Sequence, residues 1–312
     1  MEHPDGRAVV DALLRRKEAP RVALHDSPWA DTIAAWVREG YPTRKVEKRV
    51  GQTRWNPEDG RPTRVERDGE YDEPLPAWEV FGYDQVGCGG WVNYIPKFGV
   101  REVIEETDQW VITRDGAGAA FKNWKHKAGT PEHVDFHMTR RDIWEREYRP
   151  HLVQWDDRRM ANPEAVASAM ANARARGRWA YLGQLFIWEG MRHCMGDITL
   201  YESLLVDKEW IHDWCRVYTD VYKEAFTRLT ARAGPPDGIW LYEDLGYKNG
   251  LFARPETLAE MIFPYYAELV AFFHDHDLPV VLHSCGSTAE ALPLIVEAGF
   301  DALNPMERKA VG

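Results

Sequence analysis

Apolar runs alternate with amphipathic stretches along the chain, most regularly in its last quarter. Short apolar runs, typical of buried strands, lie at residues 239–243, 279–283 and 302–304. The stretches between them, residues 255–275 and 289–298, repeat apolar side chains at helical spacing, and Pro264 predicts a kink in the first. Strands that alternate with helices in this way predict a parallel sheet.

The earlier part of the chain is less regular. Its predicted strands lie at residues 21–26, 79–84 and 178–183, and its predicted helices at residues 31–38, 163–177 and 207–232, with a short helix that ends near Gly196. Residues 103–115 and 119–124 predict a β-hairpin that turns at Asp115-Gly116. Residues 43–75 are polar and have no sustained period, so we expect a surface insertion there.

The predicted strands favour an α/β fold that is either an open sheet or a shortened barrel. About six strands fit the parallel pattern, whereas a closed (β/α)₈ barrel needs eight. No GxGxxG motif follows a strand and no GxxxxGK[ST] motif occurs, which disfavours dinucleotide binding and nucleotide hydrolysis. We expect residues 1–312 to form a single domain with a polar insertion near 43–75 and an antiparallel insertion near 100–125.

Composition adds a few exclusions. The chain has 312 residues, of which 44% are hydrophobic, and this balance is typical of a folded globular protein. A net charge of −11 argues against nucleic acid or an anionic membrane surface as a partner. The first twenty residues contain no apolar core of the length expected of a signal peptide, and the sequence has no apolar run of about 18 residues. Four cysteines do not make a disulfide framework, so we expect reduced thiols and a cytoplasmic location.

The most informative residues stand where the predicted strands end. His283 and Cys285, separated by one residue, lie at the carboxyl end of the strand at 279–283, where α/β folds assemble their sites. An imidazole and a thiolate this close suit zinc, although a buried cysteine beside a hydrogen-bonded histidine has the same sequence. Gly286 permits a tight turn after them. Glu307 follows the next strand and could supply a third ligand, which leaves one position open as in catalytic zinc sites.

The segments around these residues resemble the uroporphyrinogen decarboxylase-like superfamily. The likeness is strongest after residue 237, in IWLYEDLGYKNGLFARPETLAEMIFPYY and PVVLHSCGSTAEALPLIVEAGFDALNPMERKAVG. Weaker matches are RVALHDSPWADTIAAWVREGYP, EVIEETDQWVITRDGAG and FIWEGMRHCMG. The resemblance implies a (β/α)₈ TIM-type barrel, which here would lack its last one or two βα units. It therefore favours a shortened barrel over an open sheet.

The superfamily contains cofactor-free tetrapyrrole decarboxylases and zinc methyltransferases that move a methyl group between a corrinoid and a thiol. The resemblance to the second kind implies that His283 and Cys285 are zinc ligands. Cobalamin-independent methionine synthases, which have related barrels, place a glutamate ligand at the spacing that separates Glu307 from Cys285. Both groups take a further cysteine from a later strand, which has no counterpart in this chain.

Other features depart from true uroporphyrinogen decarboxylase. Its Arg-Gln-Ala-Gly-Arg signature is absent, and His25-Asp-Ser-Pro-Trp stands in that region. Cys194 replaces the active-site tyrosine of the family on an ungapped comparison, and Asp84 stands where those enzymes use an aspartate. Decarboxylation in the haem pathway is therefore disfavoured, while His25 and Cys194 remain candidates for binding substrate.

Several polar residues have both a catalytic and a structural interpretation. Glu243 and Asp244 end a predicted strand and either act as a general base or cap the following helix. Lys248 and Arg254 either bind a substrate acid or are surface charges.

These observations lead to three functional hypotheses. The first is a zinc-dependent methyltransferase that acts on a small thiol, with a corrinoid, or a corrinoid protein as partner, supplying or receiving the methyl group. The second is a metal-free decarboxylase with Asp84 or Asp244 as the proton-handling group. The third is a non-catalytic corrinoid-binding or partner subunit. Unpaired sheet edges predict either a shortened chain or a partner covering the edge, with a homodimer as one arrangement.

Overall fold

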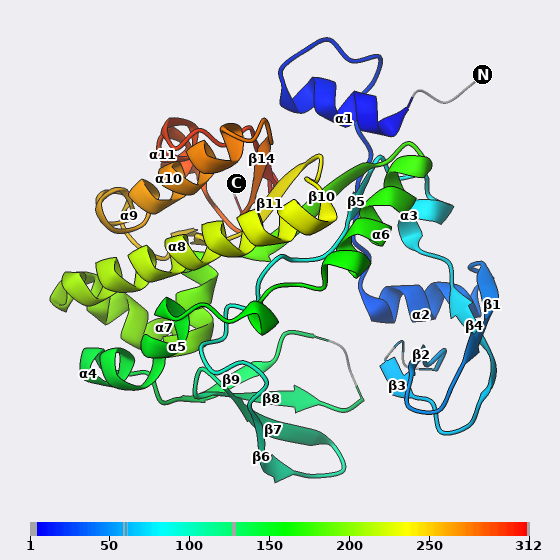
Figure 1. Ribbon diagram of the computed structural model, residues 1–312, viewed down its shortest axis with the longest axis horizontal. Helices are drawn as coiled ribbons and strands as arrows, with labels where there is room; N and C mark the ends of the chain where they lie inside the picture. Colours follow the sequence, from blue (N-terminus) through cyan, green and yellow to red (C-terminus); the bar gives the residue numbers. More distant parts are fainter. Residues whose placement is uncertain (1–4, 59, 61, 127–128, 311–312) are drawn as a thin grey trace.

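A five-stranded parallel sheet lies at the centre of the computed structural model, which describes residues 5–58, 60, 62–126 and 129–310. Its strands are β5 (Gln85–Gly87), β10 (Trp179–Leu185), β11 (Gly238–Tyr242), β14 (Val280–His283) and β15 (Ala302–Asn304). They stand in the order β15-β14-β11-β10-β5, and every neighbouring pair is parallel. The spatial order therefore follows the order in the sequence, and the described sheet does not close into a barrel (Figure 1).

Helices pack on the outer face of this sheet. They are α6 (Pro163–Ala175), α7 (Ile187–Val206), α8 (Lys208–Ala233), α9 (Pro255–Met261), α10 (Phe263–His274) and α11 (Leu292–Glu297). Alternate strand residues point to opposite faces. Leu182, Leu241 and Leu282 therefore lie in the large core beneath the helices. Tyr181 and Trp240 lie on the inner face.

A second, smaller core forms on the inner face of the sheet. Trp179, Tyr181, Trp240 and Val281 pack there against Val10. Val10 belongs to α1 (Gly6–Leu14), which contacts β5 and β10. The inner face is therefore largely aromatic, and α1 lies across the sheet at the end where the strands begin (Figure 1).

The regular part of the sequence pattern is confirmed. Strands β10, β11, β14 and β15 and helices α6 and α8 stand where the pattern predicts them. Asn162 caps α6 by accepting a hydrogen bond from the Ala165 amide. The predicted helix at 255–275 breaks between α9 and α10, directly before Pro264. The short helix predicted to end near Gly196 is confirmed, because α7 consists of two helices that meet at a kink at Gly196, whose φ of 77° is not helical.

The antiparallel insertion is a four-stranded sheet of β6 (Arg101–Glu106), β7 (Trp110–Asp115), β8 (Ala119–Trp124) and β9 (Glu132–Phe136). The predicted hairpin is confirmed as β7 and β8. The prediction of one strand over residues 103–115 is wrong, because the chain turns at residues 107–109 between β6 and β7. Thr107 holds this turn with its hydroxyl, which accepts a hydrogen bond from the Trp110 amide.

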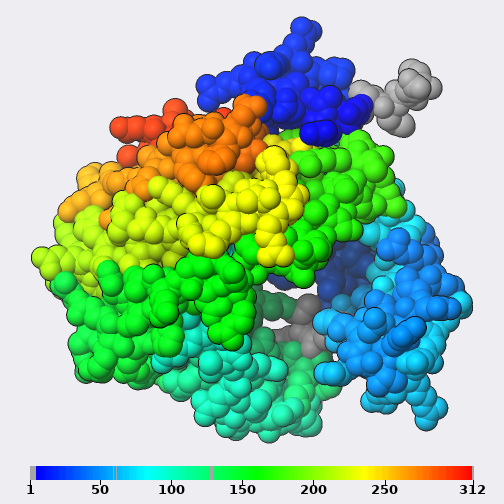
Figure 2. All heavy atoms as spheres, in the orientation of Figure 1, coloured from blue at the N-terminus to red at the C-terminus, as the bar shows by residue number. Residues whose placement is uncertain are grey.

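The polar segment 43–75 is more ordered than its sequence indicates. It contains two small antiparallel pairs, β1 (Thr43–Lys48) with β4 (Gly69–Pro74) and β2 (Thr53–Trp55) with β3 (Pro62–Arg64). Charged side chains such as Lys45 and Asp72 pair across the strands, so the segment has little apolar alternation. The segment follows α2 (Ala30–Arg38) and forms a lobe separated by a hollow from the rest of the molecule (Figure 2).

Two predicted strands are wrong. Residues 79–84 contain the end of a helical turn, α3 (Ala77–Val80), because Pro76 precedes it and Gly82 adopts a φ of 68°. Residues 21–26 are extended but form no strand. The Leu24 carbonyl accepts one backbone hydrogen bond from the Asp84 amide, and this single bond is not continued as a ladder.

The remaining short elements connect these parts. They are α4 (Arg141–Ile143), the π-helix η1 (Trp144–Tyr148), α5 (Pro150–Val153), η2 (Asp157–Arg159), β12 (Gly246–Tyr247), β13 (Gly250–Leu251) and η3 (Ala289–Ala291). No helix among the described residues has both the length and the apolarity needed to cross a membrane.

A buried ion pair attaches the extended segment to the sheet. The Asp84 carboxylate is 1% exposed and accepts hydrogen bonds from both terminal nitrogens of Arg21 and from the Leu24 amide. Burial alone would raise the pKa of Asp84, but Arg21, the Leu24 amide and Arg178 outweigh it and hold the pKa below its ordinary value of 3.8. The pair therefore stabilises the fold above about pH 4, and this contribution is lost as the pH falls further.

We expect the substitution Arg21→Ala to lower the free energy of unfolding by about 2 to 3 kcal/mol, because it leaves a buried carboxylate without its main partner. Urea unfolding at pH 7 measures the loss. Arg16→Ala, which changes an exposed arginine close by, is the control and should have little effect. Equal stability of the Arg21 variant and the unmodified protein would show that the pair does not hold the segment.

Candidate metal centre

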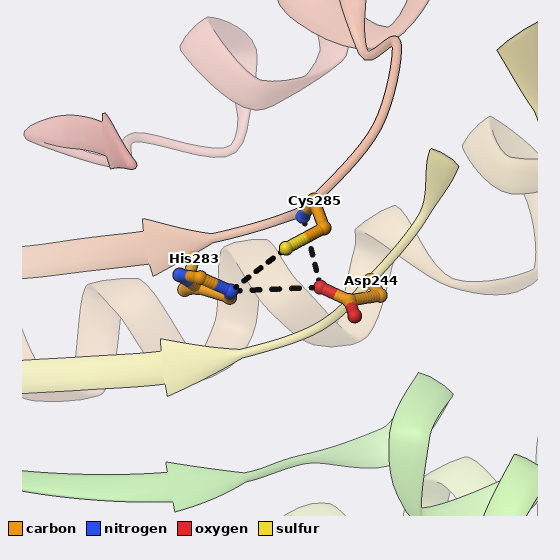
Figure 3. A group of neighbouring side chains, drawn as sticks. All are labelled: Asp244, His283 and Cys285. Atoms are coloured by element: carbon orange, nitrogen blue, oxygen red, sulfur yellow. Dashed lines mark hydrogen bonds and ion pairs between the residues drawn. The ribbon is translucent and has the colours of Figure 1, made fainter. Parts of the chain in front are cut away.

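The carboxyl ends of β11 and β14 lie side by side and carry the candidate site. Tyr242 pairs with His283 in the parallel register, so the residues that follow each strand also meet. Asp244 follows β11, and Cys285 follows β14 (Figure 3). The three polar side chains of Asp244, His283 and Cys285 point toward one another from these two strand ends.

The ligand atoms of Asp244, His283 and Cys285 lie within 4.8 Å of one another. Cys285 Sγ stands 3.4 Å from His283 Nε2, and the same nitrogen stands 3.7 Å from Asp244 Oδ1. Zinc bond lengths of about 2.0 to 2.3 Å in tetrahedral geometry place ligand atoms about 3.3 to 3.6 Å apart. Two of the spacings are therefore close to those that a bound zinc ion requires.

The orientation of His283 is set from the far side of its ring. Its Nδ1 lies 2.9 Å from Asn304 Oδ1, at the end of β15. With that oxygen as acceptor, Nδ1 carries the proton and Nε2 keeps its lone pair facing Cys285 and Asp244. Metal-binding histidines are commonly held in this way by a partner on the second ring nitrogen.

The two loops that carry the site are joined by hydrogen bonds at three successive positions. The Glu243 amide donates to the His283 carbonyl at 2.8 Å, and the Leu245 amide donates to the buried Ser284 hydroxyl at 3.0 Å. Between them, the Cys285 amide donates to Asp244 Oδ1 at 2.8 Å. These bonds fix the backbone on which the polar side chains stand.

Gly286 meets the steric requirement of the turn. Its φ is 80°, and a Cβ at this position would lie 2.6 Å from the Tyr247 amide nitrogen. A larger residue would therefore force the loops apart, as expected where two backbones approach closely.

Glu307 lies next to the site but outside the group of three. Its Oε2 accepts a hydrogen bond of 2.8 Å from the Gly286 amide. The structure thus brings Asp244 to His283 and Cys285, while the carboxylate of Glu307 binds the turn that follows Cys285.

Carboxylates surround the thiol of Cys285. Burial and the charges of Asp244, Glu307 and Glu189 raise the pKa of Cys285 to about 11. The thiol is therefore protonated at neutral pH in this environment, and a bound cation is what would favour the thiolate.

Glu243 is fully buried beneath the site. Its carboxylate accepts hydrogen bonds from the amides of Phe186 and Trp188, at the beginning of α7, and from the Tyr266 hydroxyl. Burial raises the pKa of Glu243 to about 8, against the effect of these donors. The side chain is 0% exposed, so in this arrangement it anchors α7 and does not face a substrate.

The other predicted site residues are spread over the molecule. Asp84 lies before β5, at the opposite end of the sheet from Cys285, and binds Arg21. Cys194 is buried in the middle of α7, and burial raises the pKa of its thiol. Lys248 and Arg254 are exposed.

His25 lies on the inner face of the sheet. Its ring packs 5.1 Å from the ring of Trp240 and 6.2 Å from that of Tyr181. Trp240 is in turn 6.3 Å from Tyr242, whose ring is 5.6 Å from that of His283. A continuous row of aromatic side chains therefore connects His25 with the candidate metal centre.

Sequence reasoning identified Asp244 only as a general base or helix cap and did not identify Asn304. The signal for Asp244 was its place two residues after a strand that neighbours the one ending at His283. Asn304 ends the next predicted strand, directly opposite His283 in the register.

Comparisons with known proteins agree with the resemblance. The family model for uroporphyrinogen decarboxylase (URO-D) matches residues 198–310, which include the whole candidate metal centre. Comparison with curated proteins finds no match. A solved structure titled as a methyltransferase from Methanosarcina mazei aligns with a TM-score of 0.54 and 11% identity, over 96% of this chain and 75% of that one.

The structural likeness, at this low identity, concerns the fold, while the family match covers the segment that carries β11, β14 and β15. The carboxyl-terminal third of the chain, residues 198–310, is therefore similar to the uroporphyrinogen decarboxylase family, and the whole chain shares a fold with a solved methyltransferase structure.

Proposed function

We propose that the protein is a zinc-dependent methyltransferase that moves a methyl group between a corrinoid, or a similar donor, and a thiol. The observation that carries the proposal is the convergence of a thiol, an imidazole and a carboxylate at the ends of two adjacent parallel strands. Mixed sulfur, nitrogen and oxygen ligands suit zinc. Three protein ligands leave a fourth position free for a substrate, which is the arrangement of catalytic zinc sites.

Zinc bound here would hold an acceptor thiol as a thiolate at neutral pH. His283, Cys285 and Asp244 would bind the ion, and Asn304 would keep His283 Nε2 directed at it. Asp244 has a second task, because its Oδ1 already accepts the Cys285 amide and so fixes the distance between the two loops. Glu307 is a further candidate ligand, since its carboxylate accepts a hydrogen bond from the amide of Gly286, the residue that follows Cys285.

The sheet favours a barrel as the complete fold. Its strands follow one another in sequence order without a reversal, as in a singly wound barrel, whereas doubly wound sheets reverse at a switch point. We infer that the five strands form a contiguous arc of a (β/α)₈ barrel that lacks its last one or two βα units within residues 1–312. Four free cysteines accord with a cytoplasmic location, and a corrinoid protein is the partner that we propose.

A metal-free decarboxylase is the second candidate function, because the matching family model is that of a decarboxylase. The charges around Cys285 disfavour it, since Asp244, Glu307 and Glu189 would repel the carboxylate of such a substrate. Activity that survives exhaustive chelation would favour this candidate.

The purified protein should bind about one zinc ion per chain, and the substitution Cys285→Ser should abolish both this binding and methyl transfer. Elemental analysis of metal-replete protein measures the content. Cys88→Ser is the control, because Cys88 is buried elsewhere and should leave the zinc content unchanged. Activity that persists in the Cys285 variant would rule out the proposed mechanism.

The third ligand can be identified by a pair of carboxylate variants. We expect Asp244→Asn to lower zinc affinity by about a hundredfold or more, and Glu307→Gln to lower it by less than about tenfold. Competition with a chromophoric chelator measures both affinities. The reverse order of the two effects would make Glu307 the ligand and Asp244 a residue that only orients the loop.

The role of Asn304 gives a further test. Asn304→Ala removes the partner of His283 Nδ1 and should weaken zinc binding by about ten- to a hundredfold, the range typical of such orienting residues. The thermal midpoint of the metal-free protein should change little, because the Asn304 side chain is only partly buried. Unchanged zinc affinity would show that the ring of His283 is held by its packing alone.

A further inference from the structure

A cavity of about 510 Å³ lies on the side of the sheet that carries His25. Its walls come from α2, from the segment around α3, from β5 and from Tyr181 of β10. This volume falls within the range of about 300 to 1,000 Å³ that is typical of small-molecule sites. The cavity is separate from the metal centre, to which the row of Trp240 and Tyr242 connects it.

Several aromatic side chains contribute to the described walls of this cavity. Trp55, Trp78, Tyr83, Tyr181 and His25 contribute to it. The ring of His25 lies 6.3 Å from that of Tyr83 and 6.2 Å from that of Tyr181, so three of the rings are grouped around one point. The faces of aromatic rings carry negative potential and attract organic cations, particularly quaternary ammonium groups.

The charges near the cavity also favour a cationic ligand. Asp26 is the one charged side chain among the described lining residues, where arginine and lysine are absent. Burial lowers the pKa of His25, so its ring is neutral at pH 7. Arg176 lies over the ring of Trp78 at 5.2 Å but is not part of the lining, and it is paired with Glu79. An anionic ligand would find no cationic side chain among the described lining residues.

We propose that the cavity binds an organic cation with a methylated onium head, held by the aromatic rings and Asp26. This binding goes beyond the proposed function and does not depend on it. Binding itself requires only the cavity, so the two ideas can fail separately.

Three probes of nearly equal shape and different charge test the inference: choline, its neutral isostere 3,3-dimethylbutan-1-ol and the anion 3,3-dimethylbutanoate. Isothermal titration calorimetry should give choline an affinity about tenfold or more above that of the alcohol, with no binding of the anion. Equal affinity for choline and the alcohol, tighter binding of the anion, or no binding of choline at millimolar concentration would overturn the proposal.

Variants locate the site. Trp78→Leu should weaken choline binding about tenfold, whereas Trp29→Leu, which changes an exposed tryptophan outside the cavity, should leave it unchanged. Asp26→Asn should weaken the binding of choline and leave that of the alcohol unaltered. Choline affinity that is insensitive to both cavity variants would overturn the assignment to this cavity.

The Cys285→Ser protein separates this inference from the proposed function. Choline should bind to that variant as it does to the unmodified protein, because Cys285 does not line the cavity. A protein that binds choline but holds no zinc would contradict the proposed function alone. A protein that holds zinc but prefers the neutral or anionic probe would contradict the present inference alone.

Discussion

The parallel pairing of β11 with β14 is the constraint on which the candidate site depends. The register places Tyr242 opposite His283, and the contacts among Asp244, His283 and Cys285 are a consequence of that alignment. Three hydrogen bonds then extend the pairing beyond the strands, where a ladder would otherwise end. A shift of one residue would turn the side chain of His283 to the outer face, into the core beneath the helices.

Glu243 connects the paired strands to the helices that cover them. Its amide belongs to the pairing with β14, while its carboxylate accepts the first amides of α7 and the Tyr266 hydroxyl from α10. Its oxygens thereby satisfy amides at the helix N-terminus that have no partner within the helix. Because the neighbouring residue is Asp244, the position of a proposed ligand is tied to the packing of two helices.

The sequence predicted the parts of the fold in which local pattern and tertiary packing agree. β10, β11 and β14 are buried on both faces and are apolar runs in the sequence, and α6 has both a capping asparagine and a closing glycine. The predictions failed where either the local sequence pattern or the tertiary packing was missing. The hairpins of residues 43–75 pair charged residues and bury little, while the segment at 21–26 has the composition of a strand without a strand partner.

The site was predictable to the same extent. His283 and Cys285 could be placed together because two residues apart on an extended segment share a side, which is a local rule. Choosing between Asp244 and Glu307 was not possible from spacing, because both follow strands that flank β14. The choice depends on loop geometry: Asp244 reaches the Cys285 amide, whereas Glu307 reaches the amide one residue further on.

The charges around the site determine whether the thiol of Cys285 can ionise. Without a cation, burial and three nearby carboxylates raise the pKa of Cys285 and leave an unreactive thiol, so the surroundings alone do not make a nucleophile. A divalent ion would reverse that balance, since it lowers the pKa of any thiol that binds it. Carboxylates that oppose ionisation of the isolated thiol are therefore suited to a site that binds a metal ion, because one cation would neutralise the carboxylates and favour the thiolate at the same time.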